Sequence, residues 1–297
     1  MASLKEIRGR ITSVSSTRKI TSAMKMVSAA KLKKAQNAID NSIPYLYKLT
    51  TILQDYVASL DGETLSPLTE VREVKKVLII AVSSNGSLCG AFNNNIIKAQ
   101  NIIIKAFNET YSEYANKVGK KNTFVCTIGK KISEAVEKQH IKKAIINIDL
   151  SSDIDYQSVA AFVEKVMVRF TDKNFDKVIF IYNHIKNAAI QEVRRENLLP
   201  FVPPISEKKK SIDYIVEPGK FELVNELIPK VVKLQLYSGL LDSVAAEHGA
   251  RTTAMQIATD NADELVQTLK LTYNKLRQTA ITTEIITITG GAEALRK

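Results

Sequence analysis

The stretch ARTTAMQIATDNADELVQTLKLTYNKLRQTAITTEIITIT, residues 250–289, contains neither proline nor glycine. Within it, small and apolar residues recur at alternating steps of three and four, the heptad spacing of a coiled coil. The predicted seam consists of Met255, Ala258, Ala262, Leu265, Leu269, Thr272 and Leu276. As a helix, the stretch would extend about 60 Å at ~1.5 Å per residue. The sequence therefore predicts a long helix that packs along a second helix.

Two features oppose a uniform helix at this end of the chain. Residues 279–289 (TAITTEIITIT) are rich in β-branched side chains and locally favour a strand. Gly249 also costs a helix about 1 kcal/mol relative to alanine. We nevertheless expect helix throughout, because the absence of breakers extends over the whole stretch.

The beginning of the chain shows a similar helical pattern. Leu4, Ile7, Ile11 and Val14 form an apolar seam at helical spacing. We expect this seam to continue, after a shift in phase, through an apolar set and then through alanines. The apolar set is Ile20, Met24 and Val27. Pro44 is expected to interrupt the pattern, with helix resuming up to residue 60.

Positive charge is concentrated at the N-terminus. Residues 1–34 contain nine basic residues and one acidic residue, which account for +8 of the chain's net charge of +11. Residues 255–297 carry equal numbers of acidic and basic residues, so the C-terminal helix would not neutralise this excess. The charge predicts an acidic partner, which by itself leaves open nucleic acid, anionic lipid and an acidic protein surface.

The middle of the chain has a different pattern. Val77–Val82 (VLIIAV) is a continuous aliphatic run, typical of a buried parallel strand. Helical segments at 92–107, 132–138 and 156–170 alternate with further predicted strands. These strands are at 123–128, 144–148, 177–182 and 188–195. Such alternation predicts βαβ units and a mostly parallel, Rossmann-like sheet.

The expected organisation has three parts: an N-terminal helix over 1–60, an α/β domain over 75–200 and a C-terminal helix over 220–297 that pairs with the first. The predicted fold class is thus α/β, with a long antiparallel coiled coil of the terminal helices. A simple helical hairpin within a bundle is the less specific alternative, and periodicity alone does not exclude it.

The sequence offers little support for catalysis or for a bound cofactor or metal. Cys89 and Cys126 lack metal-ligand spacing and are expected to be reduced core residues. The three histidines are scattered, without ligands at suitable spacing. The loop SSNGSLCG (83–90) lies between a strand and a helix but lacks a phosphate-loop pattern. We interpret it as a tight turn rather than a nucleotide site.

Three segments resemble the gamma subunit of F-type ATP synthases. They are LKEIRGRITSVSSTRKITSAMKMVSAAKLKKAQ (4–36), SSNGSLCGAFN (83–93) and AMQIATDNADELVQTLKLTYNKLRQTAITTEIITITGGAEAL (254–295). Their order also matches, so the resemblance spans essentially the whole chain. The loop at Asn85, Gly86 and Ser87, the stretch around Gly249, and Thr287 depart from the usual family pattern.

The resemblance implies a non-catalytic rotor shaft. Its terminal helices would insert into the head of alpha and beta subunits, where the beta subunits catalyse ATP synthesis. Its α/β domain would lie with the epsilon subunit on the membrane ring of c subunits, turned by proton or sodium flow. By motif position, Met24 and Lys25 would contact the beta-subunit levers. Arg277 and Gln278 would contact the catch loop.

Alternative functions are a nucleic-acid-binding protein with a basic arm and a small-molecule enzyme with a site near residues 83–90. The basic segment lacks interleaved aromatic residues and any nucleic-acid-binding motif, which disfavours the first alternative. No apolar run approaches the ~20 residues of a membrane span, and no signal-peptide core is visible. We expect a peripheral subunit on the cytoplasmic face of a bacterial inner membrane.

Overall fold

A computed structural model describes residues 3–58, 66–110, 123–139, 141, 154–202 and 220–294. The chain forms two compact units. Unit 1 comprises residues 1–28 and 252–297, and unit 2 comprises residues 29–251. Two long helices, α1 (Leu4–Ala58) and α6 (Lys220–Ala294), contribute to both units.

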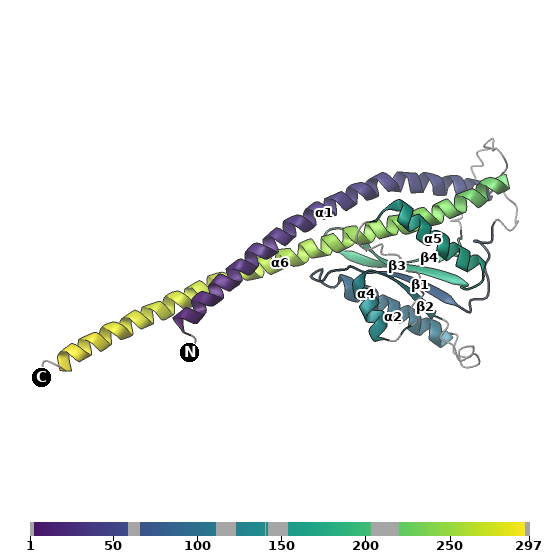
Figure 1. The fold of residues 1–297 in the computed structure, drawn as a ribbon. Coiled ribbons are helices and arrows are strands. Elements are labelled where there is room, and N and C mark those ends of the chain that lie inside the picture. The colour runs from purple at the N-terminus through teal and green to yellow at the C-terminus, as the bar shows by residue number, and fades with distance from the viewer. Residues whose placement is uncertain are drawn as a thin grey trace. The chain divides into compact units, whose positions relative to one another are not determined.

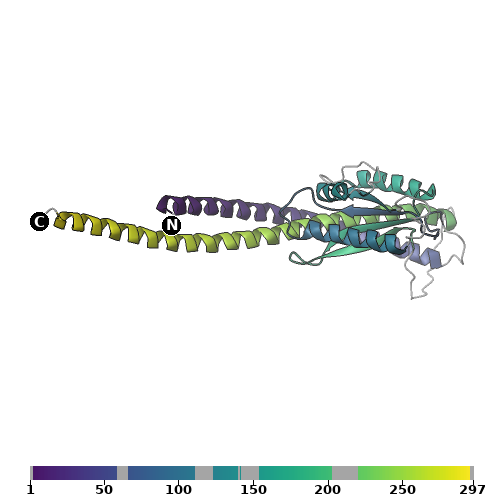
Figure 2. The ribbon, with the colours of Figure 1, turned by 90° about the horizontal axis from the view of Figure 1, so that it is seen from below.

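Unit 1 is a pair of antiparallel helical segments, one from α1 and one from α6 (Figures 1 and 2). Ser3 caps α1, its hydroxyl accepting a hydrogen bond from the backbone N–H of Glu6 at 3.2 Å. Residues facing α6 follow an unbroken heptad along α1. They are Leu4, Ile7, Ile11, Val14, Arg18, Thr21, Lys25 and Ser28, all buried or partly buried.

The predicted phase shift in the α1 seam is wrong. Ile20 and Val27 are exposed to 59% and 57%, whereas Thr21 and Ser28 are buried. The heptad continues in register, but polar residues replace apolar ones from Arg18 onward. Hydropathy gave no signal for these positions because the residues are polar. Arg18 and Thr21 make specific polar contacts with α6.

The predicted seam of α6 is confirmed at only some of its positions. Met255 and Ala262 are buried, and Leu269 and Leu276 are partly buried, as expected. At the alternate positions, Val266 and Tyr273 are partly buried in place of the predicted Leu265 and Thr272, whereas the predicted Ala258 is partly buried along with Thr259 beside it. Leu265 is 47% exposed. Both spacings alternate three and four, so only contact with α1 distinguishes them.

The C-terminal end of α6 is helical, as predicted, through the β-branched stretch up to Ala294. Its threonine hydroxyls donate to backbone carbonyls one turn earlier: Thr279 to Lys275, Thr283 to Thr279, Thr287 to Thr283 and Thr289 to Ile285. These bonds satisfy the hydroxyl groups within the helix. Residues 277–292 are all exposed, so this end of α6 has no described segment packed on it.

The interruption expected at Pro44 does not occur, because α1 continues through it to Ala58. Proline removes one helical N–H and costs about 3 kcal/mol in a helix interior. Asp40, whose carbonyl loses its usual partner one turn earlier, is exposed, and so is Pro44 itself. Leu49 and Leu53, on the opposite side, are buried in the core of unit 2. Their burial holds α1 helical despite the proline.

Unit 2 is built on a four-stranded sheet in the order β2-β1-β3-β4. The strands are β1 (Val77–Val82), β2 (Thr123–Ile128), β3 (Lys177–Ile185) and β4 (Gln191–Leu199). β1 pairs in parallel with β2 and β3, and β4 is antiparallel to β3. The mostly parallel sheet is thus confirmed, whereas the strand predicted at 144–148 lies outside the described residues.

Helices cover both faces of this sheet (Figure 1). One face packs against α2 (Phe92–Thr110) and α4 (Lys130–Lys138) through an aliphatic core. The other packs against α5 (Tyr156–Thr171) and the unit 2 portions of α1 and α6. β1 is completely buried because both its faces are covered. This explains its continuous aliphatic sequence.

Two glycines allow α6 to approach the sheet of unit 2. A Cβ at Gly239 would lie 2.4 Å from Cε1 of Phe180, far inside van der Waals contact. A Cβ at Gly249 would lie 3.3 Å from the Ala188 carbonyl oxygen and from Cδ1 of Ile185. Gly249 therefore serves close packing against the β3–β4 connection, in a helix that remains unbroken there.

Candidate functional site

Two polar pairs connect the helices of unit 1, and we call them the polar clasp. The Arg18 guanidinium contacts the Asp263 carboxylate at 2.7 Å. One turn further along, the Thr21 and Thr259 hydroxyls are 2.8 Å apart, and Thr259 also donates to the Met255 carbonyl oxygen at 2.7 Å. The Thr21 hydroxyl likewise has the Arg18 carbonyl oxygen at 3.0 Å, so one of the two hydroxyls donates across the pair while the other donates along its own helix. These pairs fix both the antiparallel direction and the axial register.

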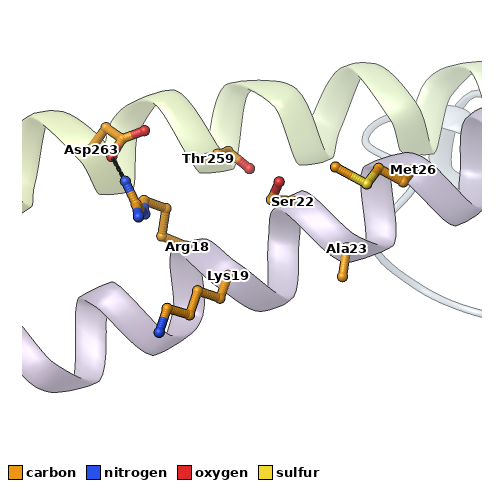
Figure 3. A pocket seen from close by; sticks show the side chains of 7 residues that line it. All are labelled: Arg18, Lys19, Ser22, Ala23, Met26, Thr259 and Asp263. Atoms are coloured by element: carbon orange, nitrogen blue, oxygen red, sulfur yellow. Dashed lines mark hydrogen bonds and ion pairs between the residues drawn. The ribbon is translucent and has the colours of Figure 1, made fainter.

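A cavity of about 450 Å³ lies beside the polar clasp. Figure 3 shows Arg18 and Ser22 toward α6, with Lys19 and Ala23 on the side of α1 that faces away. These four residues line the cavity together with Met26, Thr259 and Asp263. Small side chains leave this space because they fill less volume than the leucines of a typical zipper. Unit 1 is therefore a thin helical pair with an open, positively charged side.

Met24 and Lys25 lie beside the polar clasp, on α1. Lys25 occupies a position of the observed heptad, and both side chains are partly buried. Met26, which follows them, is 68% exposed. The surface that α1 offers here consequently consists of Lys19, Ala23 and Met26 as well as the two predicted residues.

Arg277 and Gln278 lie on the exposed end of α6. Since Thr21 faces Thr259, residue 24 of α1 lies near residue 256 of α6. Arg277 is then roughly 30 Å further along α6, at ~1.5 Å per residue. The four predicted residues thus lie at two separate levels along unit 1.

Isoleucines accompany Arg277 and Gln278 on the exposed end of α6. Ile281, Ile285, Ile286 and Ile288 are between 49% and 64% exposed. Apolar exposure of this extent on one helical segment indicates a surface that another protein covers.

Sequence reasoning missed Arg18, Thr21, Thr259 and Asp263. The available signal was the heptad of Leu4, Ile7, Ile11 and Val14, which predicts positions 18 and 21 if it is continued without regard to polarity. Thr21 and Thr259 are also short β-branched residues that can fill an inter-helix position while bonding across it.

Paired cysteines at positions 21 and 259 test the register. The double substitution Thr21→Cys, Thr259→Cys should form a disulfide readily under mild oxidation, because the hydroxyl oxygens lie only 2.8 Å apart. Mobility on a non-reducing gel reports the closed loop. The control Ile20→Cys, Thr259→Cys should stay reduced, since Ile20 is exposed on another face. Equal crosslinking of both pairs would contradict this register.

The polar groups of the loop following β1 hydrogen-bond to one another and to Asn93 at the start of α2. Asn93 Oδ1 accepts from the Ser84 backbone N–H at 3.0 Å, and Asn93 Nδ2 contacts Ser84 Oγ at 2.8 Å. The Ser84 hydroxyl donates to the Gly86 carbonyl oxygen at 2.6 Å. These contacts support the interpretation of 83–90 as a tight turn whose polar groups serve the turn itself.

The cysteines are buried and unpaired, as expected for core residues. Burial raises the pKa of the Cys126 thiol to about 12, which leaves it protonated and unreactive. Among the described residues, no group of three or more potential metal ligands is gathered in one place. The helices of the described segments likewise include none that is long and apolar enough to cross a membrane.

His248, in unit 2, lies in a positively charged setting. Burial, then the charges of Arg251 and Lys31, lower its pKa from about 6.5 to about 4. Arg251 pairs with Glu247 at 2.8 Å and approaches Nδ1 of His248 at 3.3 Å. Since this ring is neutral, its Nδ1 can accept from the guanidinium.

The pKa of His248 predicts a pH dependence of stability. Between pH 6.5 and 4 the unfolded chain protonates this histidine and the native chain does not, so its contribution to the unfolding free energy falls as the pH drops. The substitution His248→Gln should therefore flatten the loss of stability over this interval. Urea titrations at several pH values measure it, and parallel curves for both proteins would contradict it.

Comparison with known proteins identifies relatives along the whole chain. Residues 3–295 match a family described as ATP synthase. An ATP synthase gamma chain from Christiangramia forsetii is 51% identical over 296 residues, covering 99% of each chain. One from Flavobacterium johnsoniae is 52% identical over 296 residues, again with 99% coverage of each.

Solved structures agree at the level of the fold. A chain of the Euglena gracilis mitochondrial ATP synthase matches with a TM-score of 0.66 and 20% identity, over 98% of this chain and 94% of that one. The sequence identities to the bacterial relatives, which extend through both helical ends and the sheet, carry the assignment. The chain belongs to the ATP synthase gamma chain family.

Proposed function

We propose that this chain is the central rotor shaft of an F-type ATP synthase. In this role its terminal helices, over 1–60 and 220–297, form the shaft, and its α/β domain over 75–200 forms the foot. Rotation of the c-subunit ring, driven by proton or sodium flow, would turn the shaft inside the head of alpha and beta subunits. Its asymmetry would drive the beta-subunit sites through their affinity states. The chain itself would catalyse nothing.

The exposed end of α6 is the observation that supports this proposal most directly. Residues 277–292 are uniformly exposed and include four large isoleucines. Such a helix end is suited to being surrounded by apolar surface of partner subunits rather than by water. Gamma-chain identity of about half the residues over nearly the whole length supports the same role.

The charge of unit 1 supports an acidic partner around the shaft. Lys5, Arg8 and Lys19 are exposed on α1, and Arg10 pairs with Glu6 of the same helix. Exposed charges contribute about 0–1 kcal/mol each. Contacts of this strength with acidic levers of beta subunits, involving Met24 and Lys25, would guide rotation without arresting it.

The proposed assembly places the chain on the cytoplasmic face of a bacterial inner membrane, held there by its partners. Affinity purification of the tagged chain tests the assembly: alpha, beta, epsilon and c subunits should co-purify. A strain lacking the chain should lose coupled ATP synthesis, and the intact gene should restore it. Normal coupled synthesis in the deletion strain would contradict the proposal.

A further inference from the structure

A second cavity, of about 440 Å³, lies in unit 2 between α1 and α6. Lys31 and Lys34 of α1 line one wall, and His248 of α6 lines the other. Asn85, from the loop after β1, also reaches it. The remaining surface is mainly aliphatic, from Ala35, Ala38, Leu241 and Val244. Ligand sites in proteins commonly have volumes of ~300–1,000 Å³.

Positive charge at this cavity exceeds negative charge. Lys31 and Lys34 are exposed and lie one helical turn apart, and neither makes a hydrogen bond or ion pair with another described residue. The acidic lining residue, Glu247, is already paired with Arg251 at 2.8 Å. Both members of that pair are largely buried, at 18% and 13% side-chain exposure. Among the residues that the structure describes, no carboxylate thus pairs with either lysine at the cavity.

His248 reports this excess of positive charge. The groups around it are Lys31 and Lys34 on α1, Glu247 and Arg251 on α6, and the uncharged Asn85 and Ser87 of the loop. Positive charge from Arg251 and Lys31, added to burial, keeps the imidazole neutral. A bound anion would act in the opposite direction and favour the imidazolium form.

We propose that this cavity, which we call the α1–α6 anion site, binds a small phosphate-bearing molecule between Lys31, Lys34 and His248. Lysine ammonium groups bind phosphate as mobile point charges, and two of them one turn apart can approach the same phosphate group. The aliphatic wall would accommodate an organic portion of the ligand. The site involves none of the four shaft residues, so it is independent of the proposed rotor function.

Binding and protonation at this site should be linked. Because anion binding favours the charged imidazole, it should raise the pKa of His248, and the ligand should bind more tightly as the pH falls toward that pKa. The chain has three histidines, so isotope labelling of histidine gives a simple NMR spectrum. Titration of the full-length chain with inorganic phosphate and with ADP, at constant ionic strength, measures both quantities.

The variants are chosen to separate a site from general surface charge. Lys31→Gln with Lys34→Gln should weaken binding about tenfold, since two partly exposed charge contacts together correspond to about this factor. Lys33→Gln is the matched control, because Lys33 is an exposed lysine on the same helix that does not line the cavity. It should leave the affinity unchanged within about twofold.

Asn85→Asp provides a second test with little change in shape. Its side-chain oxygen accepts from the Lys130 backbone N–H at 3.0 Å, and an aspartate can keep that bond. The added negative charge should weaken phosphate binding by several-fold. Tighter binding of ADP than of phosphate would assign the site to an organic phosphate, and equal binding would assign it to free phosphate.

The proposal fails if neither phosphate nor ADP shifts the His248 resonance or its pKa. It also fails if Lys33→Gln weakens binding as much as the change of Lys31 and Lys34, because the effect would then come from the general charge of α1. The site would be established if the ligand no longer shifts the His248 resonance in the Lys31→Gln, Lys34→Gln variant but still shifts it in Lys33→Gln.

Discussion

Replacing Arg277 and Gln278 together with alanine is expected to lower ATP hydrolysis by the assembled complex about tenfold. Both side chains are exposed on the end of α6, where they support no described contact within the chain. Their removal should therefore act through a partner. Buried interface contacts of arginine commonly contribute 1–2 kcal/mol or more, and 1.4 kcal/mol corresponds to a tenfold change in rate.

Gln267→Ala with Lys270→Ala is the matched control for this experiment. Lys270 lies one heptad before Arg277, and Gln267 lies three turns before Gln278, so the control removes one cationic side chain and one glutamine from nearly the same faces of α6. The circular dichroism and assembly of both variants should equal those of the unaltered protein. Unchanged turnover of the Arg277, Gln278 variant, or an equal loss in the control, would refute the assigned contacts.

The substitution Gly239→Ala is expected to lower the unfolding free energy of unit 2 by about 1–2 kcal/mol, because the cost of overpacking exceeds the gain in helix propensity of up to about 1 kcal/mol. The new Cβ would lie 2.4 Å from Cε1 of Phe180, and that ring is fully buried. Phe180 also stacks on Tyr182, with ring centroids 4.8 Å apart, so it has little room to move. Overpacking a close-packed core costs about 1–3 kcal/mol. Urea unfolding followed by tyrosine fluorescence measures the change.

The substitution Gly290→Ala should raise the unfolding free energy instead of lowering it. Gly290 also lies in α6, but nothing lies within 4 Å of a Cβ at that position. Alanine there should stabilise the local helix by up to about 1 kcal/mol, from helix propensity alone. If both substitutions stabilised the protein, the close approach of α6 to Phe180 would be wrong.

The sequence predicted the elements more reliably than the contacts between them. VLIIAV at Val77–Val82 is a buried parallel strand, as its aliphatic run indicated. The helix through Thr279 and Thr289 also formed as predicted, and the hydroxyls of these threonines bond to backbone carbonyls of the same helix. The predicted helix break at Pro44 was wrong, because the burial of Leu49 and Leu53 outweighs the unfavourable effect of proline on the helix.

The candidate sites followed from the sequence only in part. Motif resemblance located Arg277 and Gln278, and the exposure of both is consistent with a partner contact. The polar clasp and the α1–α6 anion site were not predicted, since each joins residues more than two hundred positions apart: Arg18 with Asp263, and Lys31 with His248. No local pattern connects such residues.

The sequence by itself determined the two long helices, the parallel strands between them and the family, because periodicity, aliphatic runs and long motifs are properties of neighbouring residues. Only the tertiary structure decided which face of each helix meets the other. Met255, Ala258 and Ala262 fit one heptad, and Met255, Thr259 and Ala262 fit another equally well. Pairing of Thr259 with Thr21 selects the second, because the two hydroxyls meet at 2.8 Å between the helices, and which residues meet there depends on how the helices pack.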